Sequence, residues 1–349
     1  MMVERIAHGG GLDAAIARHG GAQADWLDLS TGINPRSYPL PPIECAAWQR
    51  LPDHAAGEAL KQAARACYRM PEGLKIVAAN GTQALIELLP RVLDTNQVAV
   101  IAPTYGEHRH VWRKTGATVS EIAREETIPA AAKVLVIVNP NNPDGAVMPV
   151  QQLVALAEEM RARDGWLVVD EAFCDTSPQA SLVPVLPENA IVLRSFGKFF
   201  GLAGLRLGFA VCQPKLADAL EALLGPWAVS GPAMAVGSVA LPDSPWIGET
   251  RQRLEAASQR LIRLLETHGF EVCGAHPLFV LASHGQAPAI AEGLAQRHIL
   301  VRSFAEMPGR LRLGLCGSDA ELQRLDTALS QVMAGETAET VTSGRQAHG

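Results

Sequence analysis

The chain has 349 residues, of which 48% are hydrophobic and 19% are charged. This composition is typical of a folded globular protein and excludes a collagen-like or largely disordered chain. The 30 Lys and Arg residues are outnumbered by 36 Asp and Glu residues, which gives a net charge of -6. A net acidic chain does not favour a broad nucleic-acid-binding surface, so we expect no nucleic-acid partner.

Six cysteines are scattered along the chain without a C-x-x-C pair. This spacing indicates reduced thiols rather than a disulfide framework or a zinc site. The N-terminal residues include early acidic residues and lack the apolar core of a secretory signal. The longest apolar runs, such as residues 134–138, are too short to cross a bilayer. We therefore expect a cytoplasmic protein with no membrane segment and no metal site.

Short apolar runs alternate with helix-like stretches in the middle of the chain. The expected helices include residues 82–93 and 150–163, and the expected strands cover residues 75–79, 98–102, 134–138, 166–169, 191–193 and 209–211. Strands that are apolar throughout, alternating with helices, predict a mostly parallel sheet covered on both faces. In such a sheet, ligands bind beyond the carboxyl ends of the strands.

A proline-containing break near residue 240, LPDSPW, precedes a change of pattern. A long amphipathic helix at residues 247–267, short strands and a final helix at residues 319–333 predict a smaller α+β domain. The expected parts are an N-terminal arm at residues 1–40, a large domain at 41–240, a small C-terminal domain at 241–335 and a disordered tail at 336–349.

The segment SFGKFFGLAGLRLG begins at Ser195, at the end of an expected strand. Lys198 lies in a tight, partly apolar turn, which suits it to form a Schiff base. Ser195 and Arg206 are suited to hold a phosphate, the arginine as a charge-assisted fork. Taken alone, a surface lysine beside a glycine-rich turn explains this pattern equally well.

Asp170 follows the expected strand at residues 166–169, and Asn142 lies in the segment NPNNPDG. A buried aspartate keeps a pyridine nitrogen protonated, which that ring needs in order to act as an electron sink. The Asn142 amide is able to donate to a phenolate oxygen on the same ring. Both residues are also ordinary turn formers.

Gly81 and Thr82 join an expected strand to the helix at residues 82–93, whose first N–H groups form an anion site. Tyr105 leaves the next strand and is able to stack on a planar ring. Helix capping and core packing are the structural alternatives. Together, the five segments supply an amine, an acid for a ring nitrogen, a phenolate donor, a stacking ring and phosphate donors, which is the set that pyridoxal phosphate requires.

The segments VLRSFGKFFGLAGLRLGF and NPNNPDG resemble those of fold-type I pyridoxal-phosphate enzymes of the class I/II aminotransferase family. The resemblance extends from about residue 8 to about residue 332. It implies an α/β fold with a large three-layer α/β/α domain, a mostly parallel sheet and a smaller α+β C-terminal domain. It also implies a homodimer.

The resemblance further implies a role for each of these side chains. Lys198 would form the Schiff base, Asp170 would bind the pyridine nitrogen, and Asn142 would donate to the ring oxygen. Tyr105 would stack on the ring. The cofactor phosphate would be held by Gly81, Thr82, Ser195 and Arg206.

One position departs from the family pattern. Many relatives have tyrosine three residues after the aspartate, where this chain has Phe173. The change removes one hydroxyl donor to the ring oxygen. The family resemblance does not depend on it, because Asn142 remains.

Within the family, the chain is most similar to the threonine-phosphate decarboxylases of cobalamin biosynthesis, which are relatives of histidinol-phosphate aminotransferases. The segments HGGG, STGINP and RLRLGLCG carry this similarity. It implies that Arg312 binds the carboxylate of a phosphorylated amino acid. It also implies that His8, Gly32 and Asn34 close on the substrate phosphate, where Arg302 adds positive charge.

The expected reaction is the decarboxylation of L-threonine O-3-phosphate to (R)-1-amino-2-propanol O-2-phosphate and CO₂. Local motifs do not decide which bond at Cα breaks, because that choice depends on how the enzyme orients the bound substrate. Transamination by a histidinol-phosphate or related aminotransferase is therefore the alternative. A regulatory pyridoxal-phosphate-binding protein without turnover is a third interpretation, which intact Lys198 and Asp170 disfavour.

Overall fold

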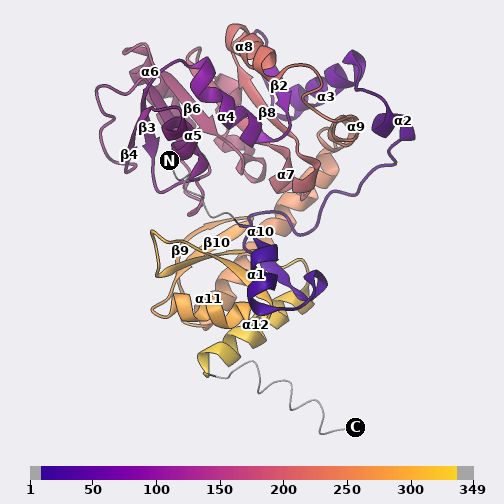
Figure 1. The fold of residues 1–349 in the computed structure, drawn as a ribbon, viewed down its shortest axis with the longest axis vertical. Coiled ribbons are helices and arrows are strands. Elements are labelled where there is room, and N and C mark those ends of the chain that lie inside the picture. The colour runs from indigo at the N-terminus through magenta and orange to yellow at the C-terminus, as the bar shows by residue number, and fades with distance from the viewer. Residues whose placement is uncertain (1–8, 336–349) are drawn as a thin grey trace. The chain divides into compact units, whose positions relative to one another are not determined.

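A seven-stranded sheet organises the larger part of the chain in this computed structural model, which describes residues 9–335 (Figure 1). Its strands are β2 (Lys75–Ala79), β3 (Gln97–Ile101), β4 (Thr118–Ile122), β5 (Val134–Val138), β6 (Trp166–Asp170), β7 (Ala190–Ser195) and β8 (Gly208–Cys212). Their order is β2-β8-β7-β6-β5-β3-β4. Within this sheet, β8 is antiparallel to β2 and β7, and the other neighbours are parallel. The expected mostly parallel sheet is confirmed.

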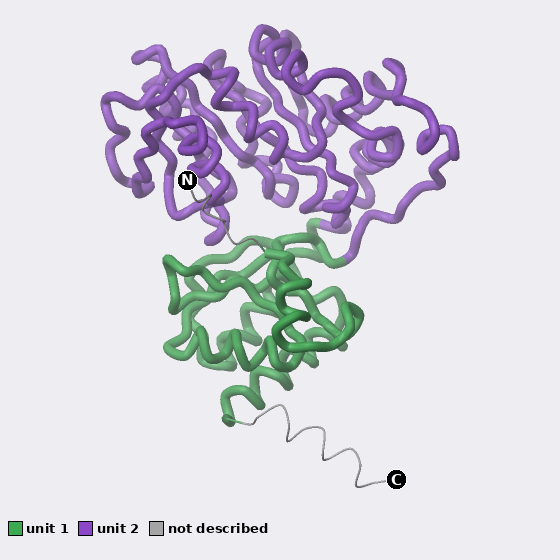
Figure 2. Tube along the Cα trace, in the orientation of Figure 1, with its two compact units in different colours: residues 1–35, 251–349 green, residues 36–250 purple. Residues whose placement is uncertain are grey.

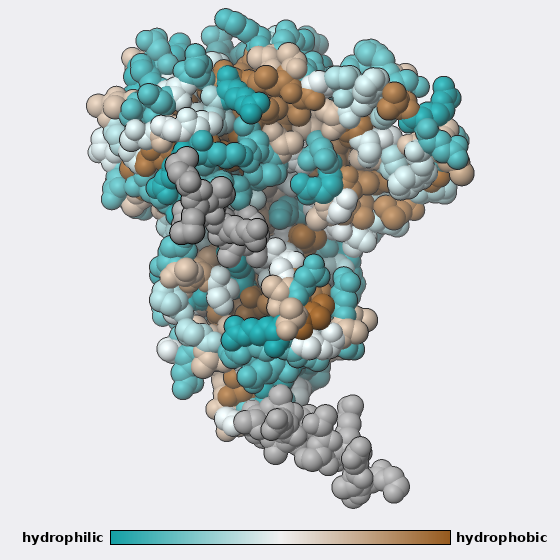
Figure 3. Space-filling view, viewed as in Figure 1, coloured by the Kyte–Doolittle hydropathy of each residue, from teal (hydrophilic) through white to brown (hydrophobic). Residues whose placement is uncertain are grey.

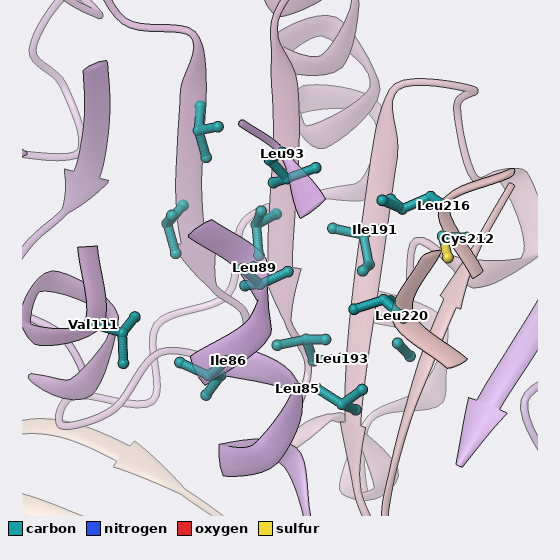
Figure 4. Packing of buried hydrophobic residues seen from close by; sticks show 14 of the residues in the cluster. Leu85, Ile86, Leu89, Leu93, Val111, Ile191, Leu193, Cys212, Leu216 and Leu220 are labelled. Carbon is teal, nitrogen blue, oxygen red and sulfur yellow. The ribbon is translucent and has the colours of Figure 1, made fainter. Parts of the chain in front are cut away.

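Helices cover both faces of this sheet, so all five residues of β5 are buried. The helices in this part of the chain are α2 (Cys45–Gln49), α3 (His54–Cys67), α4 (Thr82–Val92), α5 (Glu107–Lys114), α6 (Val150–Arg161), α7 (Phe196–Phe199), α8 (Pro214–Leu224) and α9 (Gly231–Ala240). On α4, Leu85 and Leu89 lie one turn apart and pack into a buried cluster with side chains of β7 and α8 (Figure 4). Val134 and Val136 of β5 belong to this cluster. The alternate residues of β5 are also buried and face the other side, which gives three layers.

The antiparallel pairing of β7 and β8 closes a loop at residues 196–207. Ser195, at the end of β7, is paired with Gly208 at the start of β8. Gly208 is also paired with Ala79 at the end of β2. A Cβ on Gly208 would lie 2.5 Å from the Thr82 backbone nitrogen, so only glycine allows this approach. The ends of three strands therefore meet at one residue.

The chain divides into two compact units, residues 36–250 and a second unit made from both ends of the chain (Figure 2). The described part of the second unit, residues 9–35 and 251–335, contains a five-stranded sheet of order β1-β11-β12-β10-β9. Its strands are β1 (Leu27–Leu29), β9 (Glu271–His276), β10 (Phe279–Ser283), β11 (Ile299–Ser303) and β12 (Arg310–Gly314). Its helices are α1 (Leu12–His19), α11 (Ala287–Ala295), α12 (Asp319–Met333) and most of α10 (Ser244–Thr267).

Within this second sheet, β1 is parallel to β11, and the remaining neighbours are antiparallel. The division between the units falls inside α10, after Thr250. The four domain ranges expected from the sequence remain a prediction, and the tail at residues 336–349 lies outside the described residues.

The face of the molecule shown in Figure 3 mixes hydrophilic side chains with smaller hydrophobic areas. The large apolar side chains that are exposed are Leu40, Trp48, Leu51, Val147, Val185, Leu223, Trp227 and Val239. Among residues 9–335, no helix has both the length and the apolar character needed to cross a membrane.

Candidate active site

A cavity within the 36–250 unit is lined by segments that follow the strands of its sheet. This is the edge at which parallel α/β sheets bind ligands. The eight residues predicted to contact a cofactor all line it: Gly81, Thr82, Tyr105, Asn142, Asp170, Ser195, Lys198 and Arg206. The structure thus brings together side chains that are separated by up to 125 positions in the sequence (206 − 81).

One end of the cavity is a cradle suited to an anion. Gly81 has a φ of +82°, and a Cβ there would lie 2.7 Å from Nη2 of Arg206. Arg206 has left-handed backbone geometry, with a φ of 56°, which is uncommon for a residue with a side chain. The helix α4 begins at Thr82, so its first N–H groups add to the positive potential. A phosphate group fits this donor set.

Lys198 lies on the single turn of α7, directly after β7. Aromatic side chains pack around this turn: Phe196 is stacked on Phe200 with ring centroids 4.3 Å apart, and Phe200 is stacked on Trp246 at 5.5 Å. Nζ of Lys198 lies 5.7 Å from the ring centroid of Phe173, which also lines the cavity. The packing fixes the backbone that carries the amine.

Asp170 is buried and forms a pair with His108, which the sequence reasoning missed. Nε2 of His108 lies 2.8 Å from Oδ2 of Asp170. The other carboxylate oxygen accepts a hydrogen bond from the Ala172 N–H at 3.0 Å. His108 lies in the first turn of α5, three residues after Tyr105. The rings of Tyr105 and His108 lie edge to face with centroids 6.0 Å apart, so the closeness of His108 to Tyr105 in the sequence was the available signal.

The NPNNPDG segment is held in place mainly by Asn141. Its amide nitrogen donates to the Pro103 carbonyl at 3.1 Å and to the Asp144 carboxylate at 2.8 Å. Its amide oxygen accepts from the Thr104 hydroxyl at 2.8 Å. The neighbouring Asn142 lines the cavity. Asn141 is thus a structural residue, whereas Asn142 contributes to the wall of the cavity.

A buried ionic cluster lies next to Asp170 in the sequence. Arg194 donates to Glu171 at 2.7 Å and forms a second ion pair with Asp175. Glu171 also accepts hydrogen bonds from the Ser181 hydroxyl and the Leu182 N–H, both at 2.6 Å. Arg194 immediately precedes Ser195. The cluster therefore connects the segment after β6 to the end of β7, and the sequence reasoning did not identify it.

Two arginines of the second unit face each other across a pair of strands. Arg302 on β11 is in register with Arg312 on β12. Burial, together with the nearby charge of Arg302, lowers the pKa of Arg312 to about 10. Burial also lowers the pKa of Arg302. Arg312 is buried and Arg302, which also feels the charge of Glu306, is half-buried. Two positive charges side by side are stabilised by a bound anion, so this pair is a candidate anion site.

The other predicted substrate residues lie in the same unit. Arg312 donates to the Ser30 carbonyl at 2.8 Å, at the start of the segment that carries Gly32 and Asn34. Both Gly32 and Asn34 are buried. Ser30, which was not predicted, donates to the Asp28 carboxylate from its hydroxyl at 2.6 Å and from its N–H at 2.8 Å. His8 lies outside the described residues.

The fold and the donor set define a family. The model of the family "Aminotransferase class I and II" matches residues 52–329, and the chain belongs to this pyridoxal-phosphate-dependent family. Among solved structures, the chain is similar to histidinol-phosphate aminotransferase from Sinorhizobium meliloti in complex with pyridoxal-5'-phosphate. That structure has a TM-score of 0.77 and 23% identity, over 93% of this chain and 94% of the other. The expected fold-type I architecture is confirmed.

Two curated relatives are more similar in sequence. The threonine-phosphate decarboxylase of Pseudomonas aeruginosa is 45% identical over 327 residues, which cover 93% of this chain and 97% of the relative. The threonine-phosphate decarboxylase of a Sinorhizobium species is 42% identical over 335 residues, which cover 94% and 98%. The similarity therefore extends over both compact units.

Proposed function

We propose that this chain uses pyridoxal phosphate to decarboxylate L-threonine O-3-phosphate, which yields CO₂ and (R)-1-amino-2-propanol O-2-phosphate. The similarity to two threonine-phosphate decarboxylases supports this proposal. Within the structure, the observation that carries it is the pairing of Arg302 with Arg312. The substrate has a carboxylate and a phosphate, one for each guanidinium.

The cavity residues fit the cofactor, because they combine a glycine cradle beside an arginine, a lysine amine and a buried carboxylate. When bound, pyridoxal phosphate accepts the electron pair that remains at Cα after the carboxylate leaves. Lys198 would hold its aldehyde, and Asp170 would keep a proton on its ring nitrogen. Asn142 would donate to the ring oxygen, and Tyr105 would pack on the ring. Gly81, Thr82, Ser195 and Arg206 would hold the phosphate.

The second unit supplies the residues that we assign to the substrate. Arg312 binds the carboxylate and sets its orientation, because its own side chain is fixed by burial and by the hydrogen bond to Ser30. Arg302 binds the phosphate together with Gly32 and Asn34. We assign His8 to the same phosphate. A proton returns to Cα after CO₂ leaves, so the atoms of the substrate are conserved in the two products.

We also infer the wider setting of this reaction. The product would provide the aminopropanol linker of cobalamin, and we place the enzyme in the cytoplasm. We infer a homodimer, as the family resemblance implies. Exposed apolar side chains support self-association: Trp48 and Leu51 are 67% and 66% exposed.

Product analysis tests the proposed reaction. Purified protein supplied with pyridoxal phosphate and L-threonine O-3-phosphate should release CO₂ and form aminopropanol phosphate in equal amounts, as detected by mass spectrometry. Addition of 2-oxoglutarate should have no effect. Formation of glutamate from histidinol phosphate and 2-oxoglutarate, without CO₂ release from threonine phosphate, would show an aminotransferase instead.

A further inference from the structure

Three side chains form a hydrogen-bonded chain that ends in the cofactor cavity. The Tyr105 hydroxyl donates to Oε1 of Gln83 at 3.2 Å. Nε2 of Gln83 donates to Oε2 of Glu107 at 3.1 Å. Tyr105 and Gln83 line the cavity, and Glu107 is buried at the first position of α5. No role for Gln83 or Glu107 follows from the cofactor contacts described above.

The chemistry of the three groups fixes the direction of the hydrogen bonds. A glutamine amide has a donor end and an acceptor end, whereas an ionised carboxylate only accepts. Glu107 therefore turns the NH₂ group of Gln83 toward itself. The carbonyl oxygen of Gln83 then faces Tyr105, whose hydroxyl must donate. Glu107 thus selects one orientation of Gln83, and Gln83 selects one orientation of the Tyr105 hydroxyl.

The same chain connects two parts of the cavity. Gln83 lies in the first turn of α4, directly after Gly81 and Thr82, at the end suited to phosphate. Glu107 is adjacent to His108, which is paired with Asp170. The first turn of α5 therefore holds Tyr105 through Glu107 and Gln83, and it holds Asp170 through His108.

We infer that Gln83 and Glu107 are positioning residues, which hold the Tyr105 ring in place over the pyridine ring of the cofactor. This inference rests on the cofactor assignment within the proposed function but not on the choice of substrate. Neither residue needs to touch the reacting atoms. If the inference holds, binding of the pyridine ring depends on a hydrogen-bond donor at one of positions 83 and 107 and an acceptor at the other.

Binding of 4'-deoxypyridoxine 5'-phosphate to the apoprotein tests the inference, because this analogue lacks the aldehyde and reports the non-covalent contacts alone. Isothermal titration calorimetry gives its dissociation constant. We expect Gln83→Leu to weaken binding about fivefold, as loss of one hydrogen bond in the site would do. Gln83→Glu should weaken it about tenfold or more, because two carboxylates then face each other.

The exchanged pair provides the matched control. In the double variant Gln83→Glu/Glu107→Gln, the carboxylate at position 83 accepts from both Tyr105 and the new amide, so binding should return to within about twofold of wild type. In a Tyr105→Phe background, Gln83→Leu should have no further effect. If Gln83 had a merely structural role, the losses of binding free energy would be additive with Tyr105→Phe, and the exchanged pair would not restore binding.

Three results would overturn the inference: unchanged binding by Gln83→Leu, additive losses with Tyr105→Phe, or an exchanged pair no better than Gln83→Glu alone. Thermal unfolding of each variant shows whether it folds. If Gln83→Leu does not fold, the isosteric Glu107→Gln variant takes its place in the binding measurement. If wild-type apoprotein fails to bind the analogue, the cofactor assignment and this inference fail together. If it binds the analogue but releases no CO₂ from threonine phosphate, the reaction assignment alone fails.

Discussion

His108 and Asp170 form a buried pair in which the ring Nε2 lies 2.8 Å from the carboxylate Oδ2, and their side chains are 0% and 4% exposed. Among the described residues, Nδ1 of His108 has no hydrogen-bond partner. This arrangement fits an imidazole that carries its hydrogen on Nε2 and donates it to Asp170. Since Ala172 donates to the other oxygen, both oxygens of the carboxylate are fixed.

Replacement of His108 should weaken cofactor binding without abolishing it. We expect His108→Phe to raise the dissociation constant for pyridoxal phosphate about tenfold, because a hydrogen bond to a charged group contributes about 1.5 kcal/mol. His108→Asn keeps a hydrogen-bond donor, so it should lose less affinity for the cofactor. Titration of the apoprotein, followed by the visible absorbance of the bound cofactor, measures both. Equal affinity for wild type and His108→Phe would show that Asp170 needs no such support.

The two arginines should bind different groups of the substrate, Arg312 the carboxylate and Arg302 the phosphate. We expect Arg312→Gln to raise KM for threonine phosphate by about 100-fold, since a buried charge–charge contact is worth about 3 kcal/mol. Arg302→Gln should weaken inhibition by aminopropanol phosphate, which lacks the carboxylate, more than Arg312→Gln does. Affinity for pyridoxal phosphate, which should stay unchanged, is the control. The opposite ranking of the two variants would reverse their assignments.

The three tyrosines of the chain should resist ionisation in alkali. Burial, with the charge of Asp243 and a hydrogen bond to it, raises the pKa of Tyr38 to about 12. Burial and the charge of Asp175 raise the pKa of Tyr68, and burial and the charge of Glu107 raise that of Tyr105.

Because the unfolded chain loses these protons from about pH 10, while the folded protein keeps them, the free energy of unfolding should fall as the pH rises above 10. Absorbance at 295 nm should therefore remain low at pH 10.5 and rise together with the loss of circular dichroism. A rise that begins near pH 10 in protein that is still folded would contradict this expectation.

The buried cluster around Arg194 should contribute more to stability than any surface ion pair. Arg194→Met leaves the carboxylates of Glu171 and Asp175 buried without their cation, which should cost about 3–5 kcal/mol. Arg161, which is 63% exposed and pairs with Glu158, is the matched control. Arg161→Met should cost less than about 1 kcal/mol. Urea unfolding compares the two variants, and similar losses would contradict the ranking.

Trp48 and Leu51 test the homodimer. We expect the double variant Trp48→Ser/Leu51→Ser to shift the protein toward the monomer by at least about tenfold in dissociation constant, because aromatic anchors dominate interfaces. Leu223→Ser, another exposed apolar position at 45%, is the control and should not change the mass. Light scattering coupled to size-exclusion chromatography measures both. A wild-type monomer would contradict the dimer itself.

Much of the larger unit is predictable because its strands are continuous apolar runs. The five residues 134–138 were predicted with their observed bounds for this reason. In contrast, α1 and β1 were not predicted, because they have only eight and three residues and no strong periodicity. The stability of β1 comes from its partner β11, which is about 270 positions away in the sequence (299 − 27).

The candidate site also contains some residues that were predictable from the sequence and others that were not. Lys198, Asp170 and Arg206 are each marked by the local sequence that follows a strand, so they were identified from it. His108, Gln83 and Glu107 act through other side chains, and their partners are up to 62 positions away. Such pairing depends on how α5 packs against α4, β3 and β4, which no local pattern records.

The double pairing of Gly208, with Ser195 on one side and Ala79 on the other, limits how this protein can evolve. The loop at residues 196–207 has both ends tied by this pairing, and it carries Lys198, Arg206 and the buried phenylalanines at 196, 199 and 200. A single insertion within β8 would turn every following side chain to the opposite face of the sheet. Insertions in the lineage should therefore be excluded from the strand and the loop alike, and should accumulate at exposed turns elsewhere.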